Sequence, residues 1–223
     1  MFNNSQFNNS QFVIFDCDGV IIDSNRLKMR GFKEALQEYD DHLVAELLEY
    51  NLVNGGLARD HKFRYFFKQL LSMNTNDTEK LTELKSKQFN QYCLKHFPTL
   101  PLTSGFIDYL QRLKSNDIPC YIVSGGNKGE IQLLVNQHKI SSYFKGIYGN
   151  EQSKPDAIKL ILTTANYQPE NGTFFGDSAL DGRAANQFGI PFIFVSEYAD
   201  VSTSELSELV IHKVIDNFTP LLS

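Results

Sequence analysis

The stretch FVIFDCDGVIIDSN, residues 12–25, decides the fold class. Its first apolar run ends in Asp16 and Asp18, which stand one residue apart and are followed at once by Gly19. A short run of this kind is typical of a strand that is buried on both faces, as the strands of parallel sheets are. Because side chains alternate along a strand, Cys17 is expected to point away from the two aspartates and into the core.

Four more short apolar runs follow along the chain, and apolar residues at helical spacing lie between them. Continuous apolar strands that alternate with helices are typical of an α/β fold. We therefore expect a Rossmann-like parallel sheet with helices on both faces. The expected strands are Phe12–Phe15, Cys120–Val123, Gly146–Tyr148, Thr173–Phe175 and Phe192–Val195, of which the third has the weakest pattern.

The alternation breaks between residues 25 and 97, where apolar residues recur at helical spacing and no convincing strand pattern occurs. This segment is too long for a simple connection between two strands, so it predicts an inserted all-helical cap domain. Pro98 and Pro101 mark the return of the chain into the core. The expected domains are a catalytic core of residues 12–24 and 98–223 and a helical cap of residues 25–97.

The composition narrows the class of protein. A net charge of −5 argues against a nucleic-acid binder, which would need a basic face. The sequence has neither a long apolar stretch nor a signal-peptide pattern, so we expect no membrane partner. Three scattered cysteines do not form a disulfide framework, which favours a reducing cytoplasm. FNNSQ occurs twice within residues 1–11, and this polar segment is expected to be a disordered extension.

Residues able to carry chemistry follow the expected strands directly. Because the carboxyl ends of parallel strands meet at one edge of the sheet, these side chains are expected to lie together. Several carboxylates at one edge repel one another unless a cation lies between them. The set consists of Asp16 and Asp18 after the first strand, Ser124, Gly125 and Gly126 after the second, Lys154 before a helix, and Asp177 and Asp181 after the fourth.

This set suits a phosphate group and a magnesium ion together. Mg²⁺ prefers hard oxygen ligands and usually binds few carboxylates together with the phosphate of a substrate. Ser124 and the backbone N–H groups of Gly125 and Gly126 would form a neutral cradle for an anion. Lys154 would supply positive charge, and a carboxylate could then act as a nucleophile that forms an aspartyl-phosphate.

Four segments, DCDGVIIDS, VSGG, SKP and GDSALDG, resemble the ordered motifs of the haloacid dehalogenase superfamily of phosphohydrolases. The resemblance covers Phe12–Phe194 and places the helical insertion where the helical-cap subgroup carries it. That subgroup includes phosphoglycolate phosphatase-like and β-phosphoglucomutase-like enzymes. One D-x-D-G motif alone is a weak signal, whereas four motifs in order, each at a strand end or a helix start, are a specific one.

The resemblance implies a role for each residue. Asp16 resembles the nucleophile, and Asp18 resembles the general acid/base that protonates the leaving oxygen and then activates water. Lys154 resembles the lysine that steadies the nucleophile and the phosphate, while Ser124 and Gly125 resemble the phosphate-holding motif. The implied metal ligands are Asp16, the backbone carbonyl of Asp18, Asp177 as the main acidic ligand, and Asp181 as a ligand or the partner of one.

The segment NGGLARDHKFRYFF, residues 54–67, resembles the cap loop of β-phosphoglucomutase-like proteins. By that resemblance Arg59 would bind a substrate anion, and the alternative is a surface arginine at a helix start. Lys28 stands where those mutases carry a hinge histidine, which weakens the mutase hypothesis. The aromatic cluster within residues 63–67 is expected to be hydrophobic core.

The residues and the resemblance together predict a Mg²⁺-dependent phosphatase acting on a small phosphorylated metabolite, either a sugar phosphate or a phosphoglycolate-like acid. Two alternatives stay open. One is a phosphosugar mutase of the β-phosphoglucomutase type, and the other is a catalytically inactive binding protein that kept the fold. The intact set of carboxylates argues against the second alternative.

Overall fold

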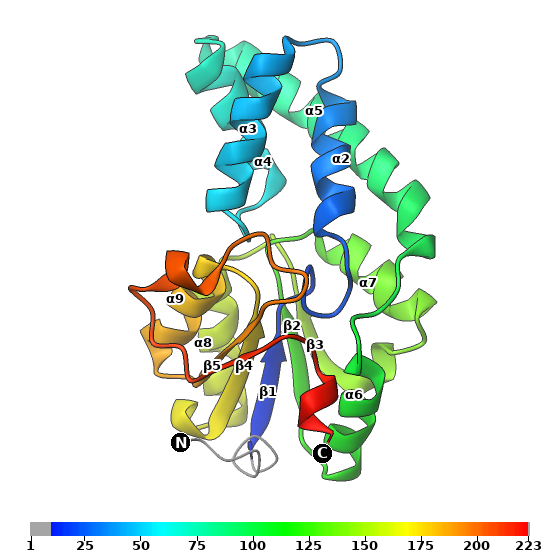
Figure 1. Ribbon diagram of the computed structural model, residues 1–223, viewed down its shortest axis with the longest axis vertical. Helices are drawn as coiled ribbons and strands as arrows, with labels where there is room; N and C mark the ends of the chain where they lie inside the picture. Colours follow the sequence, from blue (N-terminus) through cyan, green and yellow to red (C-terminus); the bar gives the residue numbers. More distant parts are fainter. Residues whose placement is uncertain (1–9, 223) are drawn as a thin grey trace.

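The computed structural model describes residues 10–222, and the centre of this part of the chain is a six-stranded sheet (Figure 1). The strand order is β3-β2-β1-β4-β5-β6, and all neighbouring strands pair in parallel. The expected α/β fold is therefore confirmed. The strands are β1 (Phe12–Phe15), β2 (Cys120–Val123), β3 (Phe144–Tyr148), β4 (Gly172–Gly176), β5 (Phe192–Val195) and β6 (Lys213–Ile215).

The strands differ from the sequence-based prediction mainly at the edges of the sheet. β1, β2 and β5 have the predicted bounds, whereas β3 begins two residues earlier and β4 is one residue longer at each end. The sequence did not predict β6, a three-residue strand at one edge in which Val214 is exposed. Such a short, half-exposed strand has no continuous apolar run to reveal it.

The alternation of side chains along β1 divides the core into two layers. Val13 and Phe15 pack in one hydrophobic cluster with residues of α6 and α7, whereas Phe12 and Ile14 pack in a second cluster with residues of α8 and α9. Helices therefore cover both faces of the sheet, as Figure 1 shows. These helices are α6 (Phe106–Ser115), α7 (Lys128–Gln137), α8 (Lys154–Ala165) and α9 (Ala179–Phe188).

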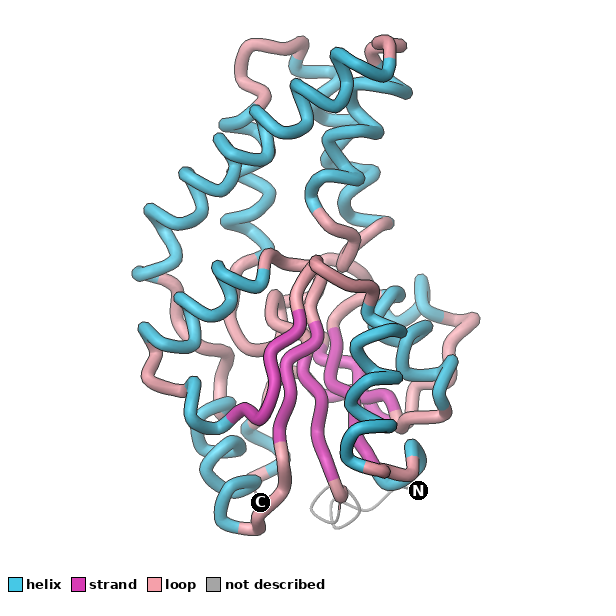
Figure 2. Tube along the Cα trace, turned by 180° about the vertical axis from the view of Figure 1, so that it is seen from behind, coloured by secondary structure: helices cyan, strands magenta, loops and turns pink. Residues whose placement is uncertain are grey.

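Residues 25–97 contain only helices and loops, and Figure 2 shows them beyond one end of the sheet. Phe32, Phe63 and Phe89 pack against one another at the centre of this helical part. Phe63, Phe66 and Phe67 are fully buried, so the expectation that they form core is confirmed. The division into core and cap domains stays a prediction. The helices are α2 (Asn25–Ala35), α3 (Asp41–Val53), α4 (Arg59–Tyr65), the π-helix η1 (Phe66–Leu70) and α5 (Thr75–His96).

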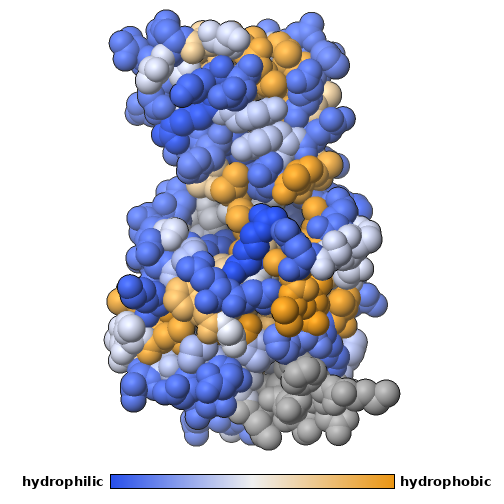
Figure 3. Space-filling model, turned by 90° about the vertical axis from the view of Figure 1, so that its left-hand side faces the viewer, coloured by the Kyte–Doolittle hydropathy of each residue, from blue (hydrophilic) through white to orange (hydrophobic). Residues whose placement is uncertain are grey.

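The expected polar extension of residues 1–11 lies outside the described residues except for its last two. Ser10 is buried, and its hydroxyl oxygen lies 2.8 Å from the hydroxyl oxygen of Thr173, so the packed chain starts before the first strand. Across residues 10–222, no helix has the length and apolar character needed to cross a membrane. Figure 3 shows a narrower waist where the helical part meets the sheet and its covering helices.

Short 3₁₀ turns complete the described chain. They lie in the connections between helices and strands or after the last strand, and none of them carries a residue of the site described below. Their bounds are η2 (Phe97–Thr99), η3 (Ser141–Tyr143), η4 (Pro169–Asn171), η5 (Thr203–Leu206) and η6 (Thr219–Leu221).

Candidate active site

Two neighbouring strands at the centre of the sheet each lead into an aspartate. Asp16 follows β1, Asp177 follows β4, and these two strands pair along their length. The strand order reverses here, because successive strands run from β1 toward β3 on one side and from β4 toward β6 on the other. In open α/β sheets, ligands bind outside the carboxyl ends of the strands at such a reversal. The fold therefore places both aspartates where a ligand is expected.

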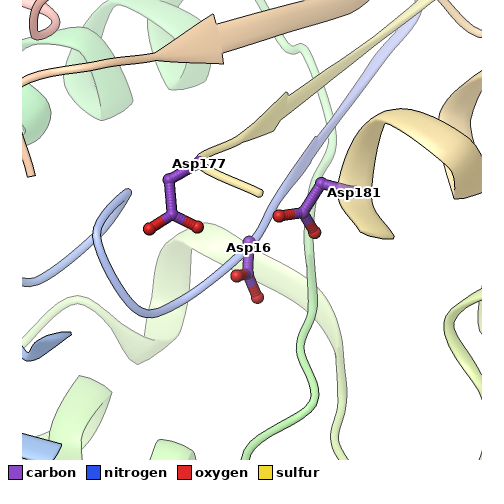
Figure 4. A group of neighbouring side chains, drawn as sticks. All are labelled: Asp16, Asp177 and Asp181. Carbon is purple, nitrogen blue, oxygen red and sulfur yellow. The ribbon is translucent and has the colours of Figure 1, made fainter. Parts of the chain in front are cut away.

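Asp16, Asp177 and Asp181 form one buried cluster (Figure 4). Each offers a carboxylate oxygen, and these oxygens all lie within 4.8 Å of one another. Asp181 comes from the first turn of α9, where it accepts hydrogen bonds from the N–H and the hydroxyl of Ser178. The ends of β1 and β4 and the start of α9 thus bring Asp16 together with Asp177 and Asp181, which lie more than 150 residues later in the chain.

Lys154 is the positive charge within this cluster. It is the first residue of α8, and its Nζ lies 3.1 Å from Oδ1 of Asp16 and donates a hydrogen bond to Asp181. Burial alone would lower the pKa of Lys154, but the charges of Asp16 and Asp181 raise it above its ordinary value. Lys154 is therefore a permanent cation that fixes the orientation of two carboxylates.

One lysine does not balance three carboxylates. Burial raises the pKa of Asp16 to about 6, Lys154 opposes this rise, and the charge of Asp181 adds to it. Burial, followed by the charges of Asp16 and Asp181, raises the pKa of Asp177 well above its usual range. This excess of negative charge in a buried space is what a bound divalent cation would relieve. Because the donors are all carboxylate oxygens, the cluster fits Mg²⁺.

Asp18 points to a different place from these three aspartates. Its carboxylate accepts hydrogen bonds from the hydroxyl of Ser24 and from the ammonium of Lys28. Burial alone would raise the pKa of Asp18, but Lys28 and Ser24 together lower it below its usual range. The Asp18 side chain is not part of the three-carboxylate cluster, so its predicted contribution to metal binding through the backbone carbonyl stays a prediction.

The loop after β2 holds Ser124, Gly125 and Gly126 beside the same cavity as Asp16. The N–H of Gly126 donates to the Ser124 hydroxyl oxygen at 3.1 Å, so it is not free for an anion in this structure. A Cβ on Gly125 would lie 2.0 Å from the carbonyl oxygen of Gly56, a residue of the helical part. Gly125 is therefore needed so that the loop before α4 can rest directly on the loop after β2.

A cavity of about 70 Å³ lies between the helical part and the carboxyl edge of the sheet. Arg59 lines it, but both of its terminal nitrogens donate to the carboxylate of Glu130 in α7, at 3.0 and 2.9 Å. The Arg59 side chain is only 9% exposed, so the alternative of a surface arginine is wrong. The predicted binding of a substrate anion by Arg59 stays a prediction, because both terminal nitrogens of its guanidinium already donate to Glu130.

Several residues of this site were missed by the sequence analysis. Asn25, the first residue of α2, donates from its side chain to Oδ2 of Asp177 at 2.7 Å and to the carbonyl oxygen of Tyr198 at 2.9 Å. Its place directly after the first motif was the one available signal. Asn51, Lys62 and Asp200 also line the cavity. Lys62 lies within the segment 54–67, in which the sequence analysis marked only Arg59 as a site residue, and no motif marked the other two.

Two curated proteins are similar to this chain. One is phosphoglycolate phosphatase 1 of Pseudomonas aeruginosa, 29% identical over 53% of this chain and 45% of that protein. The other is a phosphoglycolate phosphatase of Pseudomonas putida, 26% identical over 81% of this chain and 67% of that protein. The match to the first relative thus spans less than half of that protein's own length.

A solved structure has a similar fold. It is the β-phosphoglucomutase of Clostridium difficile, which superposes with a TM-score of 0.75 at 19% identity and covers 95% of this chain and 93% of its own. A sequence profile described as Haloacid dehalogenase-like hydrolase matches residues 13–195, most of the 223-residue chain. The matched span includes all four strand-end and helix-start motifs. The chain belongs to the haloacid dehalogenase-like hydrolase family.

Proposed function

We propose that this chain is a Mg²⁺-dependent phosphatase that hydrolyses a small phosphorylated metabolite through an aspartyl-phosphate. The observation that carries the proposal is the buried cluster of Asp16, Asp177 and Asp181 around Lys154, at the point where the strand order reverses. The phosphoglycolate phosphatases among the relatives support the same class of reaction. A cytoplasmic location remains a prediction from the sequence.

In the first step, a carboxylate oxygen of Asp16 attacks phosphorus and the bond from phosphorus to the leaving oxygen breaks. Protonated Asp18 gives its proton to that oxygen, so the leaving group departs as an alcohol. Ser124 and the N–H of Gly125 would hold the phosphoryl oxygens, and Lys154 would keep Asp16 in line. Mg²⁺ bound by the three clustered aspartates would supply positive charge for the phosphoryl group.

In the second step, water attacks the phosphorus of the aspartyl-phosphate and restores the free carboxylate of Asp16. Asp18, now ionised, accepts the proton that the water loses, and inorganic phosphate is released. Ser24 and Lys28 lower the pKa of Asp18, which favours the ionised form that this step needs and opposes the protonated form that the first step needs. The two contacts therefore suit the hydrolytic half of the reaction.

A phosphosugar mutase is the second candidate, because residues 54–67 resemble the cap loop of the mutases. A mutase must exclude water while its phosphorylated intermediate persists. Lys28 stands at the position where the mutases carry a histidine. Its ammonium is bound to Asp18, and this argues against the mutase. The fold shared with a β-phosphoglucomutase does not distinguish the two.

The deciding experiment follows the fate of the phosphoryl group. Purified protein is incubated with Mg²⁺ and either 2-phosphoglycolate or β-glucose 1-phosphate, and the products are identified by ³¹P NMR. We expect release of inorganic phosphate, and no release after the metal is removed with EDTA. Clean conversion of the 1-phosphate to a 6-phosphate would establish the mutase instead, and an absence of turnover on any phosphate ester would favour the inactive binding protein.

A further inference from the structure

The helical part supplies one wall of the cavity, called the cap wall below, and this wall contains a buried lysine. Lys62 lies in α4, is 7% exposed, and donates a hydrogen bond to the side-chain oxygen of Asn51 at 2.6 Å. Asn51, in the last part of α3, is 6% exposed and its nitrogen lies 3.0 Å from the sulfur of Met29. The Lys62 ammonium also lies 5.9 Å from the ring centre of Phe32. One buried polar side chain, Asn51, thus fixes the ammonium at the cavity.

This ammonium differs from the other two cations that line the cap side of the cavity. Lys28 is bound to Asp18, and Arg59 is bound to Glu130. Lys62, by contrast, has no carboxylate oxygen within 4.0 Å among residues 10–222, and its hydrogen-bond partner Asn51 is neutral. Burial, with the charge of Lys28 next, lowers the pKa of Lys62 to about 8, so it still carries its charge near neutral pH.

The charges of Asp18, Asp200 and Asp177 act on Lys62 only from beyond 4.0 Å. The buried ammonium has therefore lost water without gaining a directly bound anion, which is unfavourable. Such a residue persists where a ligand supplies the missing charge. The cavity places Lys62 on the cap wall, whereas Asp16 and Asp177 belong to the core wall. A substrate whose phosphoryl group lies against Asp16 would therefore present the rest of its structure toward the cap wall.

We propose that Lys62, held in place by Asn51, binds a carboxylate on the leaving group of the substrate. This inference rests on the proposed phosphatase function and narrows its substrate to small phosphorylated acids. One unpaired positive charge matches the single negative charge of a carboxylate, whereas a second phosphate would bring up to two.

A binding experiment tests the proposal independently of turnover. The Asp16→Asn protein is titrated with 2-phosphoglycolate and with 2-hydroxyethyl phosphate, in which CH₂OH replaces the carboxylate, by calorimetry in the presence of Mg²⁺. We expect the acid to bind more tightly. Adding Lys62→Met should weaken binding of the acid by roughly 10- to 100-fold, the effect of one charge-assisted hydrogen bond, and should weaken the alcohol much less. Lys80→Met, at an exposed position of α5, is the matched control and should leave the ratio unchanged.

A second variant separates recognition from a structural role. Asn51→Asp keeps the shape of the side chain and gives Lys62 a carboxylate partner within the protein. We expect it to raise Tm, because the buried charge becomes paired, and to abolish the preference for the acid, because the ammonium is no longer available. A structural ion site would gain stability without any change in the ratio of the two affinities.

The outcomes are distinct. Equal affinity of the acid and the alcohol, or equal losses for both on Lys62→Met, would overturn the role of Lys62 while leaving the phosphatase proposal intact. Wild-type protein that releases phosphate from no ester, p-nitrophenyl phosphate included, would overturn the phosphatase proposal, and the calorimetric ratio would still decide whether Lys62 binds a carboxylate. A larger kcat/KM for the acid that Lys62→Met removes would support both proposals.

Discussion

The two walls of the cavity carry charge in opposite ways. The wall at the sheet edge holds three clustered carboxylates around one lysine. Burial raises the pKa values of Asp16 and Asp177, and the charges of the neighbouring aspartates add to this rise. The cap wall holds Lys28, Arg59 and Lys62, of which two are paired with acids from the core and one is not. From this difference we infer that the sheet edge binds a metal and a phosphoryl group, whereas the cap wall binds the remainder of the substrate.

The walls also differ in how their side chains are held. At the sheet edge, Lys154 contacts both Asp16 and Asp181, and Ser178 caps α9 through Asp181, so the residues form one connected network. On the cap wall each cation has a separate partner. A change at the sheet edge should therefore abolish the reaction for every substrate, whereas a change in the cap should act on affinity, specificity or stability.

The largest effect is expected for Asp16→Asn. An amide cannot act as the nucleophile, so kcat should fall by at least about 10³-fold on p-nitrophenyl phosphate and on any other ester. Steady-state kinetics measures the loss, and circular dichroism checks that the variant folds. Near-normal turnover by the purified variant would remove the sheet edge from catalysis altogether.

The next effect concerns the metal. Asp177→Ala should raise the Mg²⁺ concentration needed for half of the maximal rate by about 100-fold, because one oxygen donor of the cluster is lost. Asn25→Ala, which removes a hydrogen bond to Asp177 and no donor to the metal, is the milder comparison and should give a smaller rise. Metal titrations of the rate test both variants, and wild-type activity indifferent to EDTA would contradict the metal site itself.

The Arg59–Glu130 pair should matter for stability more than for chemistry. Arg59→Ala leaves the carboxylate of Glu130 without its partner, and the two side chains are only 9% and 11% exposed. We expect a loss of about 2 kcal/mol in the free energy of unfolding, less than for a fully buried pair. Urea denaturation measures the loss. Glu130→Gln, which keeps the shape of the side chain and one of its two acceptor oxygens, should lose less.

Kinetics on two substrates then sharpens the assignment of Arg59. If it contacts the leaving group, Arg59→Ala should raise KM for the physiological substrate more than for p-nitrophenyl phosphate. Equal losses on both substrates would place Arg59 in the joint between cap and core and remove it from substrate recognition.

The smallest expected effect is a pH dependence of the affinity for a phosphorylated acid, and we assign it to the cap wall alone. Burial, with the charge of Lys28 next, lowers the pKa of Lys62 to about 8, and the charges of Asp18, Asp200 and Asp177 oppose this. The charge of Lys62 is therefore present below pH 8 and lost above it, so affinity for a phosphorylated acid should fall about tenfold between pH 7 and pH 9. Calorimetry with the Asp16→Asn protein should show this fall for 2-phosphoglycolate, and a parallel fall for 2-hydroxyethyl phosphate would assign the effect to the sheet edge.

The sequence predicted the sheet edge better than the cap wall, for physical reasons. Asp16, Ser124 and Asp177 each follow a strand that is buried on both faces, so a continuous apolar run announces each of them. Since the carboxyl ends of parallel strands meet, their proximity follows from the fold class alone. Even Asp181 could be anticipated, because it lies one helical turn after the last of these strands.

The cap wall depends on packing that no local pattern specifies. Asn51 and Lys62 lie on different helices, and they meet only because α3 and α4 pack together. The pairing of Arg59 with Glu130 joins residues 71 positions apart across the joint between cap and core. Similarly, the capture of Asp18 by Lys28 depends on how α2 leaves the sheet, so the sequence could mark Lys28 as unusual without naming its partner.

We expect the contact between Gly56 and Gly125 to limit the turnover rate. The carbonyl oxygen of Gly56 occupies the space where a side chain at residue 125 would begin, so the cap loop presses on the loop that would hold the phosphate. A newly formed phosphate ion would be enclosed until these two backbones separate, and that separation is movement through solvent rather than bond chemistry. Turnover of a good substrate should then slow as solvent viscosity rises, while turnover of a poor substrate, limited by its own phosphorus–oxygen bond, should not.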